Sequence, residues 1–167
     1  RDSIWEADQN HCTEVTDVQT VDISLLKGMD KEIEKVRLNT KAFIDGKLAN
    51  NVLVWGARGM GKSTLIKSVV LAACSMSNSL KIIEVARDDI GQADKLIKTI
   101  KNINKKFIIF CDDISFDDNE TSYKSLKSLL DGGLIGGAQN LLIYATSNRR
   151  HLLSRKTGNN NDFMRWE

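Results

Sequence analysis

The chain has 167 residues, which is enough for one domain with a substantial hydrophobic core. Apolar residues make up 41% of it and charged residues 28%, proportions that are typical of globular proteins and argue against a globally disordered chain. The net charge of +2 argues against an obligatory nucleic-acid binder but leaves room for a local basic face. Neither a signal peptide nor an apolar run of membrane-spanning length is present.

The cysteines and the first 22 residues indicate the setting of the predicted domain. Cys12, Cys74 and Cys111 are scattered along the chain and have the spacing of neither a disulfide framework nor a zinc site. We therefore expect a reduced, soluble, cytoplasmic setting with no membrane partner. Residues 1–22 carry six carboxylates against a single Arg1 and are weakly periodic. We interpret them as an acidic leader that is extended or partly ordered.

Helices and strands are predicted to alternate from residue 30 onwards. Four short apolar runs predict buried strands at residues 50–56, 80–86, 107–112 and 140–148. Helical spacing of apolar residues predicts helices at residues 30–46, 61–76, 88–103 and 119–133. This alternation predicts an α/β fold, with three αβα layers around a central, mainly parallel sheet. The carboxyl ends of parallel strands meet at one edge, where such sheets bind ligands.

Three of the predicted helices have an apolar face that is expected to pack on the sheet. For residues 30–46 this face is expected to contain Ile33, Val36, Leu38, Ala42 and Phe43, and Gly46 is expected to end the helix. For residues 88–103 it is expected to contain Ile90, Ala93, Leu96, Ile97 and Ile100. For residues 119–133 it is expected to contain Tyr123, Leu126, Leu129 and Leu130.

A phosphate-binding loop is predicted between the first strand and the following helix. Residues 56–63, GARGMGKS, fit the pattern G-x-x-x-x-G-K-S/T in that structural context. Glycines let successive backbone N–H groups face phosphate oxygens, and the helix adds its positive N-terminal end. Lys62 is expected to reach the β- and γ-phosphates, and the Ser63 hydroxyl to bind Mg²⁺. The expected cofactor-binding residues are Gly56, Ala57, Arg58, Gly59, Met60, Gly61, Lys62, Ser63 and Thr64, with Arg58 and Met60 at variable positions.

Two adjacent aspartates follow the third apolar run. Asp112 is the first polar residue after it, and an apolar strand that ends in Asp is typical of the residue that holds Mg²⁺ in P-loop proteins. Asp113 is then placed to polarise a water molecule that attacks the γ-phosphate. The alternative for Asp113 is that it accepts backbone hydrogen bonds in the turn that follows.

With these motifs the sequence resembles the AAA+ ATPases, in which an acidic residue, usually Glu, follows the magnesium Asp and activates water. This chain has Asp113 there, and its Asp-Asp pair resembles the bacterial replication initiators and helicase loaders of that superfamily. The resemblance also implies a sensor 1 residue at the end of the fourth strand. Asn148 matches this place best and Thr146 is the second choice, while the alternative is that both only cap the strand.

The adenine base is contacted, in the family that the chain resembles, largely by the segment before the first helix. The matching segment here is LLKGMD, residues 25–30, so Leu26, Gly28 and Met29 are the candidates. The alternative for Leu26 and Met29 is packing in the core.

A closer resemblance extends over residues 25–153. The segments GMDKEIEKVRLNTKAFIDG, FIIFCDDISF, YKSLKSLLDGG and LLIYATSNRRHL are similar, in the same order, to the predicted-ATPase family called domain of unknown function 815. This resemblance implies an AAA+ core at residues 23–153 with ATP as its ligand, and it implies no substrate. Members of that family continue into a small helical lid, which we expect to be missing or truncated here, with the polar tail 154–167 as a remnant.

The expected function is an ATP-binding AAA+ protein with Mg²⁺-dependent ATP hydrolysis, coupled to an unknown partner. AAA+ proteins usually draw an arginine finger from the region that is not recognisable here, so Arg149 and Arg150 are candidates to act in trans in a homo-oligomer, or else form an exposed basic loop. The alternative is an ATP-dependent scaffold or loader-like switch with little turnover. It would act on DNA or a DNA-bound partner through a basic face, for which the candidates are Lys101, Lys105, Lys106, Arg149 and Arg150.

A third alternative is a different P-loop class, such as a GTPase or a nucleotide kinase. The sequence argues against a GTPase because no guanine-reading N/T-K-x-D run follows a strand. It argues against a kinase because no arginine-rich lid is visible.

Overall fold

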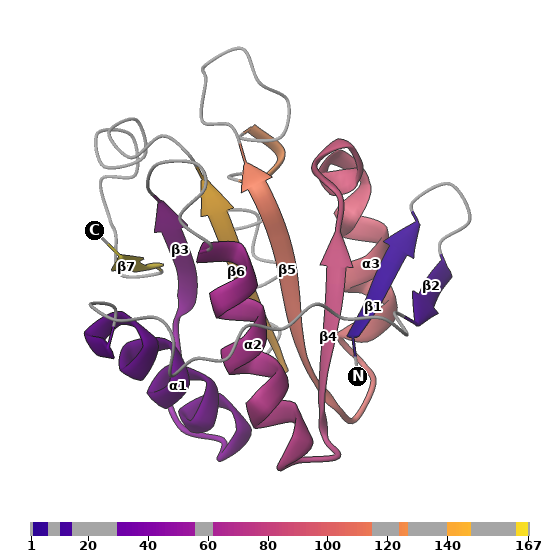
Figure 1. The fold of residues 1–167 in the computed structure, drawn as a ribbon. Coiled ribbons are helices and arrows are strands. Elements are labelled where there is room, and N and C mark those ends of the chain that lie inside the picture. The colour runs from indigo at the N-terminus through magenta and orange to yellow at the C-terminus, as the bar shows by residue number, and fades with distance from the viewer. Residues whose placement is uncertain are drawn as a thin grey trace.

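The computed structural model describes residues 2–6, 11–14, 30–55, 62–114, 124–126, 140–147 and 163–166. Their strands form one seven-stranded sheet in the order β2-β1-β4-β5-β6-β3-β7 (Figure 1). The strands are β1 Asp2–Glu6, β2 His11–Glu14, β3 Asn51–Trp55, β4 Leu80–Val85, β5 Lys106–Ile114, β6 Leu141–Ser147 and β7 Phe163–Trp166. Every neighbouring pair is parallel except β1 and β2, which are antiparallel. The predicted central, mainly parallel sheet is therefore confirmed.

Helices lie on both faces of this sheet. They are α1 Asp30–Ile44, α2 Lys62–Ser75 and α3 Ala93–Ile100, and a 3-10 helix, η2 Arg87–Gln92, directly precedes α3. The first two helices cover one face and α3 covers the other (Figure 1). Side chains alternate between the faces along each strand, so Ile108 and Phe110 of β5 pack with α1 and α2, while Ile109 and Cys111 pack with α3. The three predicted αβα layers are therefore confirmed.

The apolar face predicted for residues 88–103 is confirmed, although the helix begins later than expected. All five of its apolar residues are buried: Ile90, Ala93, Leu96, Ile97 and Ile100. The segment from Arg87 to Gln92 is 3-10 and the α-helix starts at Ala93. Gly91 has a poor helix propensity, and short 3-10 turns are frequent at helix starts, which accounts for the difference.

The face predicted for α1 is confirmed at three of its five residues, while Ala42 is only partly buried and Leu38 is exposed. Ile33, Val36 and Phe43 are buried, but Leu38 is 52% exposed. A residue two positions after Val36 lies about 200° around the helix from it, on the opposite side. The helix ends as predicted before Gly46, whose φ of +75° is a left-handed conformation that glycine adopts without steric cost.

Two polar residues of α1 take buried places that apolar periodicity did not indicate. The Asn39 side-chain amide donates to the Tyr144 hydroxyl at 3.0 Å and to the Asn50 carbonyl at 2.8 Å, and the Thr40 hydroxyl lies 2.7 Å from that of Tyr144. Burial raises the pKa of Tyr144 to about 12, so the phenol stays neutral and keeps its proton to donate. This network joins α1 to β6 and to the segment before β3.

Both ends of the described chain contribute strands that were not predicted. The segment 2–6, part of the expected acidic leader, is extended, but it pairs with β4 and places Trp5 in the core, only 1% exposed. Residues 163–166, part of the expected tail, form β7 and pair with β3. Strand β1 has one fully buried apolar side chain and an exposed Ile4, which is too weak a pattern to predict a strand from.

The predicted helix at residues 119–133 is described only at residues 124–126, which are helical. Leu126, one of its predicted core residues, is 2% exposed and packs in the cluster beneath α3. Tyr123, Leu129 and Leu130 lie outside the described residues. In the part of the chain that is described, no helix is both long enough and apolar enough to cross a membrane.

Candidate functional site

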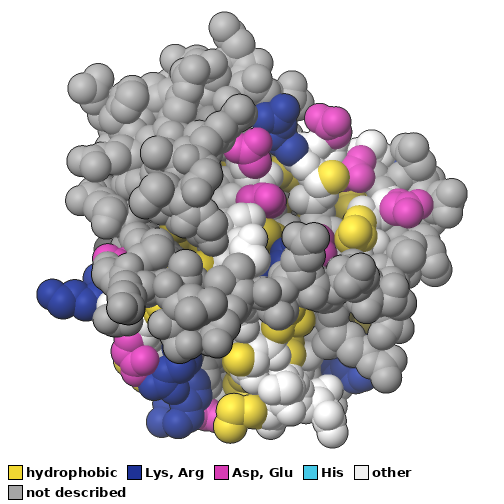
Figure 2. Space-filling model, in the orientation of Figure 1, with side chains coloured by type: hydrophobic (Ala, Val, Ile, Leu, Met, Phe, Trp, Pro, Cys, Tyr) yellow, Lys and Arg dark blue, Asp and Glu magenta, His cyan; other side chains and the backbone are white. Residues whose placement is uncertain are grey.

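The carboxyl ends of four neighbouring parallel strands meet at one edge of the sheet. Strands β4, β5, β6 and β3 are parallel to one another, and they point the same way in Figure 1. Several acidic residues lie at or just beyond these ends: Glu84, Asp88, Asp89, Asp112 and Asp113. Figure 2 shows acidic side chains gathered in the upper part of this view, where the strands end. An anionic ligand at this edge therefore needs cations to bind beside these carboxylates.

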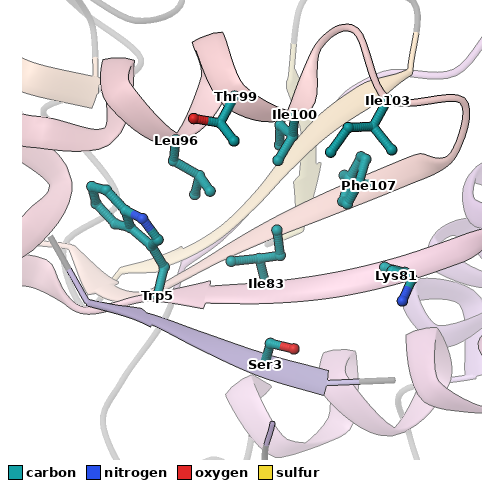
Figure 3. Close-up of a pocket in the computed structure, with 9 residues that line it drawn as sticks. All are labelled: Ser3, Trp5, Lys81, Ile83, Leu96, Thr99, Ile100, Ile103 and Phe107. Carbon is teal, nitrogen blue, oxygen red and sulfur yellow. The ribbon is translucent and has the colours of Figure 1, made fainter. Parts of the chain in front are cut away.

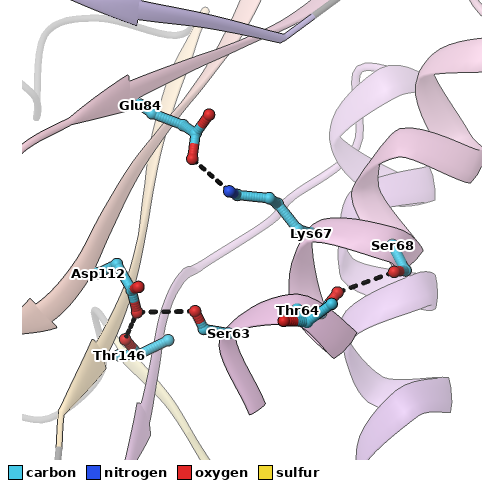
Figure 4. Close-up of polar contacts among 7 residues, drawn as sticks. All are labelled: Ser63, Thr64, Lys67, Ser68, Glu84, Asp112 and Thr146. Carbon is cyan, nitrogen blue, oxygen red and sulfur yellow. Dashed lines mark hydrogen bonds and ion pairs between the residues drawn. The ribbon is translucent and has the colours of Figure 1, made fainter. Parts of the chain in front are cut away.

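Two hydroxyl groups, from two other elements, donate hydrogen bonds to the same oxygen atom of Asp112. The Ser63 hydroxyl, in the first turn of α2, donates to Asp112 Oδ1 at 2.8 Å. The Thr146 hydroxyl, near the end of β6, donates to the same oxygen (Figure 4). Asp112 is exposed, whereas Thr146 is buried. The arrangement joins the start of α2 to the ends of β5 and β6.

Strand β5 does not end at Asp112, as the sequence predicted, but continues to Ile114 through a bulge. Cys111 pairs with Ala145 and Ile114 with Ser147, so both aspartates lie opposite Thr146 alone. The Asp113 N–H donates to the Thr146 hydroxyl oxygen at 2.8 Å. Asp113 has a φ of +58°, and it is the one non-glycine residue with positive φ among the described residues. Asp adopts this conformation more readily than most side chains.

The neighbouring thiol of Cys111 is not a nucleophile at neutral pH. The side chain is buried beneath α3, on the opposite face from the Ser63 contact. Burial, and then the charge of Asp112, raise the pKa of Cys111 from 9.0 to about 12. The thiol therefore stays protonated, and Cys111 acts as a small core residue, as the sequence indicated.

The oxygen atoms around Asp112 suit a cation that takes only some of its ligands from the protein. Within the described residues, no group of three or more His, Cys, Asp or Glu side chains is arranged to hold a metal. One carboxylate and two hydroxyls are hard oxygen donors, which Mg²⁺ prefers. Mg²⁺ commonly uses one or two carboxylates together with water and substrate phosphates. The donor set present here fits Mg²⁺ in that mode.

The sequence-predicted site residues fall into two groups. Ser63 and Asp112 are brought together, Asp113 is adjacent to them, and Lys62 is the first residue of α2. Thr64 is in the same turn, and its carbonyl accepts a hydrogen bond from Ser68 at 2.8 Å. The other candidates lie outside the described residues: Leu26, Gly28, Met29, Gly56, Ala57, Arg58, Gly59, Met60, Gly61, Asn148, Arg149 and Arg150.

Sequence reasoning missed one pair of residues near this edge. Of the two candidates for sensor 1, Thr146 has a hydroxyl that contacts both aspartates, and Asn148 lies outside the described residues. Lys67 of α2 forms an ion pair with Glu84 of β4 close to the same edge (Figure 4). The available signals were the spacing of four residues between Ser63 and Lys67, and a glutamate inside an otherwise apolar strand.

A cavity elsewhere in the molecule is separate from this site. It has a volume of about 260 Å³ and lies between α3 and strands β1, β4 and β5 (Figure 3). Its lining includes Trp5, Ile83, Leu96 and Phe107, which belong to the core on the α3 face. Asp112 contacts α2 on the opposite face. The cavity is therefore not part of the group around Asp112.

Solved structures with the same fold include three that cover 84% of this chain. The ORC1 protein of Aeropyrum pernix in complex with DNA gives a TM-score of 0.61 at 14% identity, and 45% of that chain is covered. Hsp104 of S. cerevisiae in a casein complex gives 0.57 at 18% identity, with 26% covered. A RuvB variant of Thermotoga maritima gives 0.51 at 16% identity, with 45% covered. The chain thus spans less than half the length of each.

These likenesses show the fold, which is that of an AAA+ P-loop ATPase. No curated protein matches the chain. The family model described as "Protein of unknown function (DUF815)" matches residues 2–166, nearly the whole length, and the resemblance seen in the sequence is thereby confirmed. This chain belongs to the DUF815 family and has the fold of an AAA+ P-loop ATPase.

Proposed function

We propose that the chain binds ATP together with Mg²⁺ at the carboxyl ends of β3, β5 and β6 and hydrolyses it, in a cycle that is coupled to a partner. The observation that carries this proposal is the meeting of Ser63 and Thr146 on one oxygen of Asp112. In this protein the serine follows directly on the lysine of a phosphate-loop pattern, and the aspartate lies at the edge where the strands end. A hydroxyl and a carboxylate are thus held within hydrogen-bonding distance of each other at this edge.

The residues divide the work as follows in the proposal. The phosphates are bound by Thr64 and by the backbone N–H groups of residues Gly56, Ala57, Arg58, Gly59, Met60 and Gly61. The adenine base is contacted by Leu26 and Gly28. Lys62 supplies a cation to the β- and γ-phosphates, while Ser63 and Asp112 hold Mg²⁺. Mg²⁺ held by these two residues would supply positive charge to offset that of the phosphates. Asp113 accepts a proton from the attacking water, which Asn148 orients.

A scaffold or loader-like switch with little turnover is the second candidate, and the conformation of Asp113 favours it. The left-handed backbone and the short side chain together limit where this carboxylate can reach. An activating arginine would then come from a second copy of the chain or from a partner. DNA, or a protein bound to it, is a proposed target because ORC1 was solved with DNA and shares the fold.

Titration of the wild-type protein with ATP and GTP, each with and without Mg²⁺, tests the proposal. We expect saturable ATP binding that Mg²⁺ strengthens and that GTP does not match. Phosphate release, measured alongside oligomeric state by light scattering, separates the two candidates: steady turnover supports the ATPase, and tight binding without turnover supports the switch. A folded protein that binds no ATP in Mg²⁺ would contradict both.

Thr146→Val is expected to lower the free energy of unfolding by about 1–3 kcal/mol, because the Asp113 N–H loses its acceptor in a partly buried place. We also expect turnover to fall roughly tenfold, which corresponds to about 1.4 kcal/mol of lost positioning. Urea unfolding and phosphate release measure the two effects. Thr146→Ser keeps the hydroxyl and is the matched control, so equal losses in both variants would show that the hydroxyl is not what matters.

A further inference from the structure

A second contact between α2 and the sheet lies one helical turn beyond the Ser63–Asp112 contact. Lys67 is four residues after Ser63 and forms an ion pair with Glu84 of β4 (Figure 4). Its ammonium group also lies 5.6 Å from the centre of the Phe110 ring of β5. Residues four apart on a helix lie on the same side, so Ser63 and Lys67 both face the sheet. Lys67 thus contacts two strands with one charged group.

The pairing of β4 and β5 places these groups in one row with the site. Glu84 lies directly opposite Phe110 in the parallel pair. Phe110 precedes Asp112 by two residues, so their side chains are on the same face of β5. One turn of α2 separates Ser63 from Lys67, and two residues of β5 separate Asp112 from Phe110. These separations are similar in length along the two elements. The two contacts therefore hold one turn of α2 in register with the sheet.

The environment of this ion pair makes it stronger than a surface pair. The side chains of Lys67 and Glu84 are 24% and 19% exposed, whereas those of Arg37 and Glu34, which pair within α1, are both 51% exposed. Reduced solvent access strengthens the attraction, and an aromatic face adds to it for a cation. Loss of one partner also leaves the other charge partly desolvated.

Most of the buried surface of α2 is apolar and has little direction. The buried apolar residues of α2 are Leu65, Ile66, Val69 and Val70, and the buried Ser68 donates a hydrogen bond to the Thr64 carbonyl within the helix. Apolar packing sets how close two elements lie, but it does not specify a register as sharply as an ion pair whose two ends are on different elements. The polar contacts are thus the ones that orient the first turn of α2.

We propose that Lys67 and Glu84 form a positioning pair that orients the first turn of α2 so that the Ser63 hydroxyl faces Asp112, and that this pair sets the affinity for Mg²⁺. The proposal rests on the proposed function for its second half. Neither residue contacts the ligand; both act through Ser63, as groups around a metal site commonly act through its direct ligands. Removal of either residue is therefore expected to raise the Mg²⁺ requirement and to leave the affinity for nucleotide without Mg²⁺ unchanged.

The Mg²⁺ requirement is measured with a fluorescent ATP analogue. The measured quantity is the Mg²⁺ concentration that gives half of the full Mg²⁺-dependent gain in affinity for the analogue. We expect this concentration to rise roughly tenfold in Lys67→Met and Glu84→Gln, which is the smallest effect usually seen when a group that supports a metal ligand is removed. Affinity for the analogue without Mg²⁺ is expected to stay at the wild-type value. Lys67→Arg keeps the charge and is expected to restore the requirement, and Arg37→Met, which breaks the exposed pair on α1, is expected to leave it unchanged.

The double variant Lys67→Met/Glu84→Gln guards against a single variant that fails to fold. It leaves no unpaired charge, so its stability is expected to lie closer to wild type than that of either single variant. The raised Mg²⁺ requirement is expected to persist in it, because the directional contact is still missing. A double variant with the wild-type requirement would show that unpaired charge, rather than lost positioning, causes the effect, and it would overturn the proposal.

Hydrogen exchange of the ligand-free protein tests the pair independently of nucleotide. We expect amide exchange at residues 63–68 to be faster than wild type in Lys67→Met and Glu84→Gln, because the first turn of α2 opens more often in these variants. In Arg37→Met we expect the exchange rate of these residues to be unchanged. Wild-type exchange in both variants would overturn the positioning role. A wild-type protein that binds no Mg²⁺–ATP would overturn the proposed function and the Mg²⁺ role of the pair, while the exchange result still decides whether the pair orients α2.

Discussion

Replacing Lys62 by alanine is expected to weaken ATP binding by about 100-fold, which corresponds to roughly 3 kcal/mol for a lost hydrogen bond between charged groups. Lys62 begins α2, one residue before the serine that contacts Asp112. A cation there offsets the phosphate charge at an edge of the sheet that carries several carboxylates. Equilibrium titration with ATP in saturating Mg²⁺ measures the effect.

The matched control for this experiment is Lys98→Ala. Lys98 is an exposed lysine in the last turn of α3, on the other face of the sheet. The Lys98→Ala variant is therefore expected to bind ATP with wild-type affinity. Because both variants lose one positive charge, a difference between them reports position rather than net charge. Unchanged ATP affinity in Lys62→Ala would contradict the phosphate-loop interpretation of residues 56–63.

Replacing Asp113 by asparagine is expected to reduce ATP turnover by about 100-fold or more, the usual contribution of a general base, while ATP binding is retained. Asparagine has nearly the same shape, accepts the left-handed conformation that Asp113 adopts, and keeps the backbone N–H that contacts Thr146. Phosphate release under single-turnover conditions measures the chemical step. Wild-type turnover in this variant would show that Asp113 is not the residue that activates water.

A glutamate at this position separates reach from backbone conformation. Glu is the usual residue of the AAA+ ATPases here, yet in the left-handed conformation it costs about 1–2 kcal/mol more than in the extended one, a cost that Asp relieves by local hydrogen bonding. We therefore expect Asp113→Glu to be less stable than Asp113→Asn in urea unfolding and no faster than wild type in turnover. Faster turnover by Asp113→Glu than by the wild-type protein would indicate that the reach of the Asp113 side chain limits turnover.

The predictions that the sequence supported best were those that depend on local patterns. Apolar runs located β3, β4, β5 and β6, the sequence located α1, α2 and α3, and helical spacing identified the buried apolar residues of α3 in full. Alternation of these elements was enough to predict the αβα layers. These features depend on neighbours in the chain, and burial of apolar surface repeats with the period of each element.

The short strands β1 and β7 depended on partners that are distant in the chain. β1 pairs with β4, and β7 pairs with β3, in both cases about 80 residues or more away. Such strands gain their stability from hydrogen bonds to an existing sheet rather than from an apolar pattern of their own. The burial of Asn39 has the same origin, since Tyr144 on β6 supplies the hydrogen bond that Asn39 requires when it is buried.

The amino-acid sequence by itself determined the order of the elements, the layer architecture, and the residue types that end the strands, because these follow from local periodicity and composition. The tertiary structure decided which of those residues meet. Only the bulge in β5 places Asp112 and Asp113 both opposite Thr146, and only the packing of α2 on β4 and β5 pairs Lys67 with Glu84. Contacts between elements depend on register and packing angle, which no local pattern encodes.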